Sequence, residues 1–105
     1  MSSDADPQAA RRIRRCILTH LYSWFLEVPL AVVELRQLAE TCRADARELN
    51  WNIVYLEKKG WVSLSHDTSC PPFVSCSVEL TADGIDLVED ADRFDALFPA
   101  EKEAD

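Results

Sequence analysis

The stretch over residues 44–64, ADARELNWNIVYLEKKGWVSL, constrains the fold more than any other part of this chain. Asp45 stands where a helix N-cap is expected, and Glu48 follows three residues later, which is the spacing of a capping box. Gly60, after two lysines, can take the left-handed conformation that ends many helices. Between these signals, one helix face is apolar at Leu49, Ile53 and Leu56. The stretch therefore predicts a helix with both ends specified, followed by a strand of alternating residues, WVSLSHD.

A longer helix is predicted before this stretch. Pro7 suits the first turn of a helix, because the N–H that proline lacks would have no partner there. The helix should end around Glu27, just before Pro29. Its apolar stripe recurs at spacings of three and four residues, at Ile13, Ile17, Leu21 and Trp24.

Three further elements follow from shorter patterns. The segment PLAVVEL is consistent with an edge strand or with an extended entry into a short helix, VELRQLAETC. WVSLSHD and SVELT are expected to form a hairpin, and the Pro71–Pro72 pair excludes regular structure from its extended tip. Thr81 can cap a final helix that continues in some form to Phe98.

Composition bounds the class of protein. The chain has 105 residues, of which 48% are hydrophobic and 29% charged, so we expect one small globular domain. The net charge of -8 is uneven, because residues 81–105 hold nine acidic and two basic residues, whereas the preceding part holds ten acidic and nine basic. A near-neutral body neither requires nor excludes a nucleic-acid partner. With no apolar run long enough to cross a bilayer and no signal peptide, we expect a cytoplasmic protein without membrane association.

The order of these elements resembles the winged helix-turn-helix fold over residues 9–89. ADARELNWNIVYLEKKGWVSL resembles the capped third helix of many bacterial regulators, in which a Leu-Glu-x-x-Gly turn leads into the wing. LTADGIDLVED resembles the exit from the wing, where Thr-x-x-Gly is frequent. The resemblance to small bacterial or phage transcription regulators implies an α+β domain with a three-helix core, a two-stranded wing hairpin and an additional C-terminal helix. We expect residues 1–8 to be a disordered lead-in, residues 9–98 the domain and residues 99–105 an acidic tail.

The resemblance implies that Asp45 to Lys59 form a recognition helix for double-stranded DNA, presented by a homodimer. With its apolar stripe inward, this helix turns Asn50 and Tyr55 outward, where they can pair with adenine and with phosphate. The arginines that begin the first helix can add phosphate contacts or can pair with the acidic tail. The candidate nucleic-acid-binding residues are Arg47, Asn50, Trp51, Tyr55, Lys58, Lys59, Arg11 and Arg15.

An alternative function is a winged-helix protein–protein interaction module that does not bind DNA. The predicted wing contains no Lys or Arg, although wings that hold DNA generally carry at least one. Trp51 and Val54 would leave an apolar patch on the exposed helix face, which indicates covering by the chain itself, by a dimer mate or by another protein. The final helix is the expected dimer element. The candidate protein-interface residues are Trp51, Val54, Phe73, Val74, Phe94, Leu97 and Phe98, with Tyr55 beside them.

The remaining chemistry of the chain is sparse. A reducing compartment favours free thiols at the four cysteines, two of which would fill small core spaces. His66 with Cys70 and Cys76 has the donors of a zinc site without a compact Cys-x-x-Cys spacing, and the two thiols can also form a disulfide. With only two glycines and no nucleophile beside either histidine, we expect no enzyme, no metal and no cofactor.

Overall fold

The computed structural model describes residues 7–66 and 69–99, so most of the predicted lead-in and acidic tail lies outside the described residues. Within this part the chain is an α+β protein of five helices and one small antiparallel sheet, which confirms the predicted class. The elements are, in order, α1 (Pro7–Glu27), β1 (Val33–Glu34), α2 (Leu35–Cys42), α3 (Ala46–Lys58), β2 (Val62–Leu64), β3 (Ser77–Leu80), α4 (Ala82–Glu89) and α5 (Ala91–Leu97).

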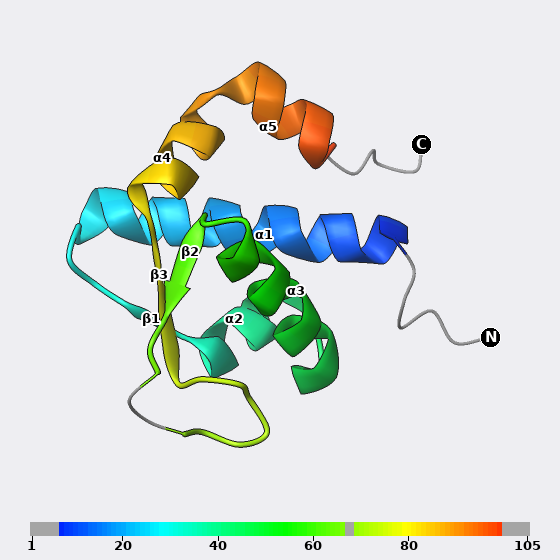
Figure 1. Ribbon diagram of the computed structural model, residues 1–105, viewed down its shortest axis with the longest axis vertical. Coiled ribbons are helices and arrows are strands. Elements are labelled where there is room, and N and C mark those ends of the chain that lie inside the picture. The colour runs from blue at the N-terminus through cyan, green and yellow to red at the C-terminus, as the bar shows by residue number, and fades with distance from the viewer. Residues whose placement is uncertain (1–6, 67–68, 100–105) are drawn as a thin grey trace.

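Helix α1 runs through the middle of the molecule, with α2 and α3 on one side of it and α4 and α5 on the other (Figure 1). Its buried side chains follow the predicted stripe as far as Leu21, and they meet the buried faces of α2, α3 and the sheet. Trp24, the last residue of the predicted stripe, is instead exposed. The helix begins at Pro7 and ends at Glu27, both as expected. These buried side chains of α1 are Ile13, Ile17, Leu18 and Leu21.

The sheet has the strand order β1-β3-β2, and both pairings are antiparallel. The predicted hairpin is present, with Val62 opposite Leu80 and Leu64 opposite Val78. The short segment before α2 forms an edge strand, because Val33 pairs with Val78 on its inner side. The sheet therefore brings the connection before α2 next to the strand that follows the hairpin tip.

Helix α3 has both of the ends that the sequence specified. The Asp45 side chain accepts a hydrogen bond from the Glu48 backbone N–H at 2.8 Å, and the Glu48 side chain accepts from the Asp45 N–H at 3.1 Å. This is the predicted capping box. Gly60 follows the helix with φ +82°, the conformation that favours glycine.

The end of α3 and the start of α4 are joined by Thr81. Its hydroxyl donates to the Gly60 carbonyl oxygen at 2.6 Å and accepts from the Gly84 N–H at 3.0 Å, while its own N–H donates to the Trp61 carbonyl oxygen. Gly84 lies so close to Trp61 that a Cβ on it would sit 2.1 Å from the Trp61 carbonyl oxygen. The two motifs quoted above, one before the hairpin and one after it, thus meet in space.

The C-terminal helix differs from the prediction. It is broken at Asp90, which has φ −92° and ψ 86° and caps α5 by accepting from the Arg93 N–H. Helix α5 consequently folds back, and Phe94 and Phe98 are buried, with the Phe98 ring packed edge-on against Trp61. The expectation that these two rings form a dimer surface is therefore wrong for this conformation, because the chain's own core already covers them.

The four cysteines also differ from the prediction. Cys16 pairs with Cys42 and Cys70 pairs with Cys76 as disulfides, so the expectation of free thiols is wrong. The first pair links α1 to the end of α2, and the second closes the connection between β2 and β3. A zinc site at His66 would find no thiolate there, because both nearby sulfur atoms are paired.

Substitution of Gly84 by alanine should destabilise the fold by about 2–3 kcal/mol, because the added Cβ meets the Trp61 carbonyl oxygen and forces a backbone shift. The control is Gly60→Ala, where no atom lies within 4 Å of the new Cβ and the left-handed backbone alone costs about 1 kcal/mol. Urea unfolding curves measure both. Equal losses in the two variants would contradict the close approach of α4 to Trp61.

Candidate nucleic-acid interface

The outer face of α3 and its C-terminal end expose the predicted cations and the predicted tryptophan. Trp51 is 45% exposed, and the Arg47 guanidinium lies over its ring, 4.9 Å from the centroid. Lys58 is exposed in the last turn of the same helix, and Lys59 is exposed just after it. The Lys59 ammonium also approaches the Trp61 ring, at 5.3 Å from its centroid. The structure therefore brings Arg47, Trp51 and the two lysines to one helix and its end.

Asn50 does not face solvent as an adenine-reading side chain would. Its Nδ2 donates to the Pro72 carbonyl oxygen at 2.9 Å, and its Oδ1 accepts from the Val74 N–H at 2.9 Å. Both hydrogen-bonding groups of the amide are thus engaged by the backbone between β2 and β3. In this conformation Asn50 positions that connection against α3, and it cannot make the bidentate contact with adenine that was expected.

Tyr55 is also engaged within the chain. It is half-buried, and the Arg14 guanidinium of α1 stacks on its ring at 3.8 Å from the centroid. The Arg14 Nε donates to the Oδ1 of Asn52, which is buried between the two helices and donates to the Glu48 carbonyl oxygen. Burial lowers the pKa of Arg14, with Arg11 adding to the effect and Tyr55 opposing it. The arginines of α1 were expected to meet phosphate or the acidic tail, and the contact of Arg14 with Asn52 and Tyr55 of α3 was not predicted.

The two arginines chosen from α1 have different surroundings. Arg15 forms an ion pair with Asp95 at 2.8 Å, donates to the Phe98 carbonyl oxygen and lies over the Phe94 ring. Its guanidinium therefore holds α5 on α1. The acidic side chains of the tail lie outside the described residues, so the expected pairing of the arginines with the tail stays a prediction. Arg11 is exposed, and it is near enough to Arg14 to affect its pKa.

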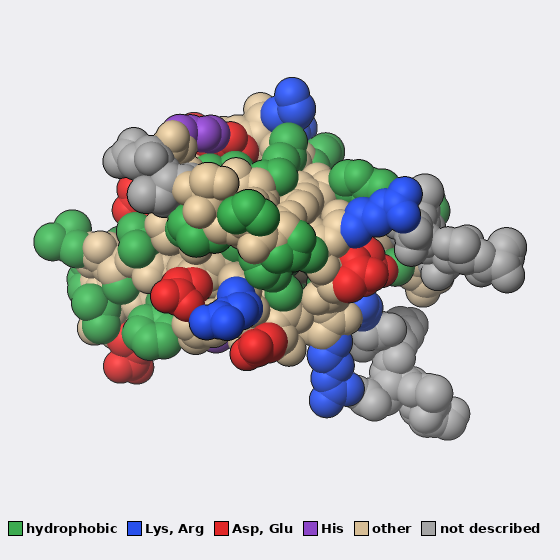
Figure 2. Space-filling model, turned by 90° about the horizontal axis from the view of Figure 1, so that it is seen from below, with side chains coloured by type: hydrophobic (Ala, Val, Ile, Leu, Met, Phe, Trp, Pro, Cys, Tyr) green, Lys and Arg blue, Asp and Glu red, His purple; other side chains and the backbone are tan. Residues whose placement is uncertain are grey.

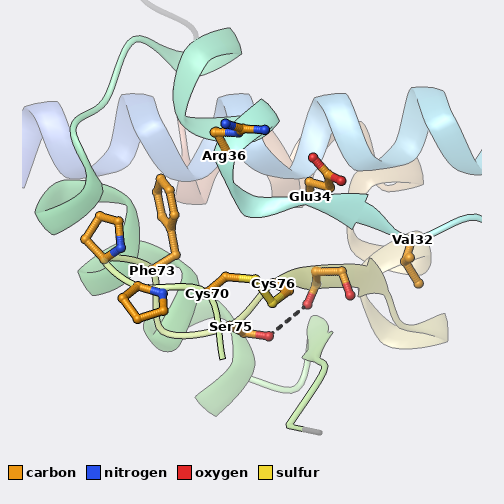
Figure 3. Close-up of a pocket in the computed structure, with 10 residues that line it drawn as sticks. Val32, Glu34, Arg36, Cys70, Phe73, Ser75 and Cys76 are labelled. Atoms are coloured by element: carbon orange, nitrogen blue, oxygen red, sulfur yellow. Dashed lines mark hydrogen bonds between the residues drawn. A yellow bond between two sulfur atoms is a disulfide. The ribbon is translucent and has the colours of Figure 1, made fainter. Parts of the chain in front are cut away.

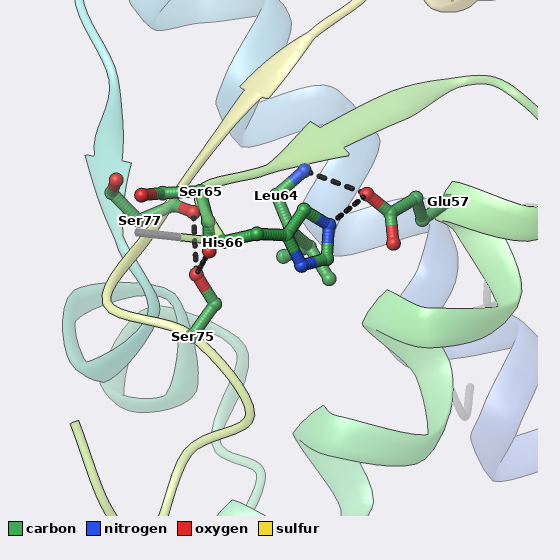
Figure 4. Close-up of polar contacts among 6 residues, drawn as sticks. All are labelled: Glu57, Leu64, Ser65, His66, Ser75 and Ser77. Atoms are coloured by element: carbon green, nitrogen blue, oxygen red, sulfur yellow. Dashed lines mark hydrogen bonds and ion pairs between the residues drawn. The ribbon is translucent and has the colours of Figure 1, made fainter. Parts of the chain in front are cut away.

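The connection between β2 and β3 is tied down at several points. Ser75 is buried, and its hydroxyl donates to the backbone carbonyl oxygens of Ser65 and Ser77 (Figure 4). The disulfide between Cys70 and Cys76 closes the same segment. These contacts close the loop of residues 70–76 in the connection and fasten it to the end of β2 and the start of β3.

This loop presents an apolar surface beside α3. Val74 is exposed, whereas Phe73 is half-buried and packs against the core, as Val54 of α3 does. On the face shown in Figure 2, which carries this loop, hydrophobic side chains gather near the middle, with basic and acidic side chains interspersed around them. Residues 60–92 contain no Lys or Arg. The β2–β3 hairpin thus offers no Lys or Arg to a phosphate backbone.

A cavity of about 610 Å³ lies between this loop and the start of α2. One wall is formed by Glu34 and Arg36, and the other by Phe73 and the disulfide of Cys70 with Cys76 (Figure 3). A hollow with mainly apolar walls and a few polar groups is the usual setting for a small ligand. Besides Glu34 and Arg36, the polar residues that line it are Ser75 and Ser77, and the Ser75 hydroxyl donates to backbone carbonyl oxygens.

Glu57 links α3 to β2 through two hydrogen bonds. Its Oε2 accepts from the Leu64 N–H at 3.0 Å and from the His66 Nε2 at 3.1 Å (Figure 4). Partial burial acts to raise the pKa of this carboxyl, but the hydrogen bonds from Leu64 and His66 and the nearby charges outweigh it and lower the pKa. The ionised form of Glu57 is therefore the form that stabilises this junction.

Comparison of the chain with protein-family models, with curated proteins and with solved structures found no match. Over residues 7–66 and 69–99, no helix combines the length and the apolar character needed to cross a membrane. In the same residues, no group of three or more His, Cys, Asp or Glu side chains is placed to hold a metal ion.

Replacing Asn50 by alanine should loosen the loop without unfolding the domain. Loss of the two hydrogen bonds to Pro72 and Val74 should speed hydrogen exchange at the Val74 N–H by about tenfold, which corresponds to about 1.4 kcal/mol. The matched control is Trp51→Ala, which removes the next, exposed side chain of the same helix. If Val74 exchanges equally fast in the parent and in the Asn50 variant, Asn50 does not hold the loop.

Replacing Glu57 by glutamine should produce a pH-dependent loss of stability. Because folding lowers the pKa of Glu57, its stabilising contribution is complete above the ordinary value of 4.5 and is lost as the pH falls through the lowered pKa. Urea unfolding should therefore show the parent more stable by about 1 kcal/mol at neutral pH, and the difference should vanish in acid. Glu79→Gln, at an exposed position of β3, is the control. A difference that persists unchanged in acid would rule out the carboxylate as its source.

Proposed function

We propose that this chain is a winged helix-turn-helix domain that binds double-stranded DNA and acts in transcription regulation, with α3 as the recognition helix. The element order supports the fold, since α1, α2 and α3 form a helical core and the β2–β3 hairpin follows α3 directly. The turn between α2 and α3 supports it as well, because Arg43 takes a left-handed conformation with φ 54° and allows α3 to start three residues later.

The observation that carries DNA binding is the group of exposed cations around the outer face of α3. Arg47 and Lys58 lie on the helix, Lys59 follows it, and Arg11 lies on the adjacent α1 next to Arg14. Cations presented by a helix and its neighbour can neutralise phosphates on both sides of a groove. With Asn50 and Tyr55 engaged inside the chain, the contacts should be mostly to phosphate, and sequence discrimination should be weak.

A second candidate function is a winged-helix module that binds another protein through α3 and the loop beside it. Two observations favour it: the amide of Asn50 is bound to the loop, and the hairpin carries no basic residue. Trp51 and Val74 are then the exposed apolar side chains of the binding surface, and Arg47 stacks on the first of them. Tryptophan and arginine are the residues that most often dominate such interfaces.

Binding to a mixed-sequence DNA duplex should weaken steeply as salt is added, because each phosphate contact releases counterions. Alanine at Arg47 or at Lys58 should each reduce the slope of log K against log salt by about 1. The control is Arg93→Ala, an exposed arginine of α5 on the other side of α1. Fluorescence anisotropy of a labelled duplex over a salt series gives all four slopes.

Absence of binding at low salt, or slopes that the Arg47 and Lys58 variants leave unchanged, would overturn the DNA proposal. The second candidate then has its own readout. A protein captured by the parent chain should be lost with Trp51→Ala and with Val74→Asp, and should be retained with Arg93→Ala.

A further inference from the structure

The end of α1 and its connection to β1 expose an apolar segment that neither proposed function uses. Over residues 24–32 five large hydrophobic side chains are exposed, and Leu30, at 92%, is the most exposed large hydrophobic residue described. Leu26 is 61% exposed on the last turn of α1. The others are Trp24, Val28 and Val32. We refer to residues 24–32 as the apolar link.

The apolar link leads directly into an open edge of the sheet. Strand β1 pairs with β3 on one side only, and no strand among the described residues covers its other side. The connection lies at the left of the molecule in Figure 1, and hydrophobic side chains also gather at the left margin of Figure 2. Proteins usually protect such edges with short strands and charged side chains; here β1 has two residues and carries the exposed Glu34, whereas residues 28–33, VPLAVV, which lead into it, contain no charge.

The area of the apolar link is that of an interface core. Its five exposed side chains together offer on the order of 500 Å² of apolar surface, judged from the sizes of such side chains. A standard interface buries roughly 800 Å² on each partner, and about 65% of a homodimer interface is apolar. The apolar area that one partner must bury in such an interface is therefore close to the exposed apolar area of this segment.

The local distribution of charge permits a second copy of the chain as the partner. A chain of net charge -8 repels its own copies and anionic membrane surfaces at most positions, whereas the uncharged segment 28–33 places no like charges against each other. Extended edges can also pair antiparallel about a two-fold axis without needing a second surface. In the register that sets Val33 opposite its own copy, the outward-facing backbone groups of Glu34 pair with those of Val32 of the other chain, so the two carboxylates do not oppose each other.

We propose that the apolar link and β1 form a homodimer interface, in which the β1 edges of two copies pair and produce a continuous six-stranded sheet. Leu26, Leu30 and Val32 pack across the two-fold axis. This interface replaces the one expected at the C-terminal helix, whose Phe94 and Phe98 are buried in their own chain. It does not depend on DNA binding, and it is tested without DNA.

The test is light scattering of the purified chain over a range of concentrations, with Leu30→Glu as the disrupting variant. Because Leu30 is almost fully exposed, the substitution removes little core packing, and circular dichroism should show an unchanged fold. The parent should have twice the mass of one chain, and Leu30→Glu should weaken association at least tenfold. Leu97→Glu, at an exposed apolar position of α5, should leave the dimer intact.

Hydrogen exchange supplies the second measurement. The outward-facing amides of residues 31–34 should become protected as the parent concentration rises, and they should not in Leu30→Glu. A parent that stays monomeric at high concentration, or a dimer that Leu30→Glu leaves intact, would overturn the proposal. A monomer that binds zwitterionic lipid vesicles through Leu30 would also overturn it, and would assign the apolar link to a lipid surface.

Discussion

The arrangement of this fold depends on one small junction, where the backbone after α3 meets the backbone before α4. The Thr81 hydroxyl bridges the Gly60 carbonyl oxygen and the Gly84 N–H, and Gly84 has no side chain because the Trp61 carbonyl oxygen occupies that space. This contact closes the base of the hairpin, fixes the exit direction of α4 and places Trp61 where Phe98 can pack on it. The hairpin and the two C-terminal helices are therefore positioned relative to α3 by a few hydrogen bonds and one missing Cβ.

The arginines of α1 form a second layer of connections. A cluster of four basic residues in a sequence usually indicates a solvated or ligand-binding surface. Here three of the four bind other elements of the same chain, and the helix uses its basic side chains to hold α2, α3 and α5 around it. These contacts leave few basic side chains of α1 for a partner. DNA binding is therefore proposed for exposed cations of α3 and its end, Lys58, Lys59 and the Arg47 that also lies over the Trp51 ring, together with Arg11 of α1. The partners are the Cys42 carbonyl oxygen for Arg12, Asn52 and the Tyr55 ring for Arg14, and Asp95 for Arg15.

Sequence reasoning predicted what local signals determine and failed where a partner lies far along the chain. The Asp45–Glu48 capping box and the helix limits at Pro7 and Glu27 depend on neighbours within a few residues, and the structure contains them. Asn50 looked like a base-reading residue because its partners are 22 and 24 residues away. Likewise, the sequence pattern of the predicted final helix is the same whether its apolar face contacts another chain or packs on its own core. The break at Asp90 lets α5 turn back onto the core, but the sequence shows this break only as a weak capping signal.

The placement of exposed groups limits how this domain can engage a partner. The loop bound to Asn50 covers the N-terminal half of α3 on one side, so the accessible part of that helix is the strip from Arg47 through Trp51 to Lys58. A strip with so few cations neutralises few phosphates, and one copy should bind DNA weakly. Two copies joined at β1 would double the contacts and make the second binding event intramolecular, which raises the effective affinity without any new contact. The apolar link lies on the opposite side of the sheet from α3 in Figure 1, so self-association of this kind would leave both strips accessible.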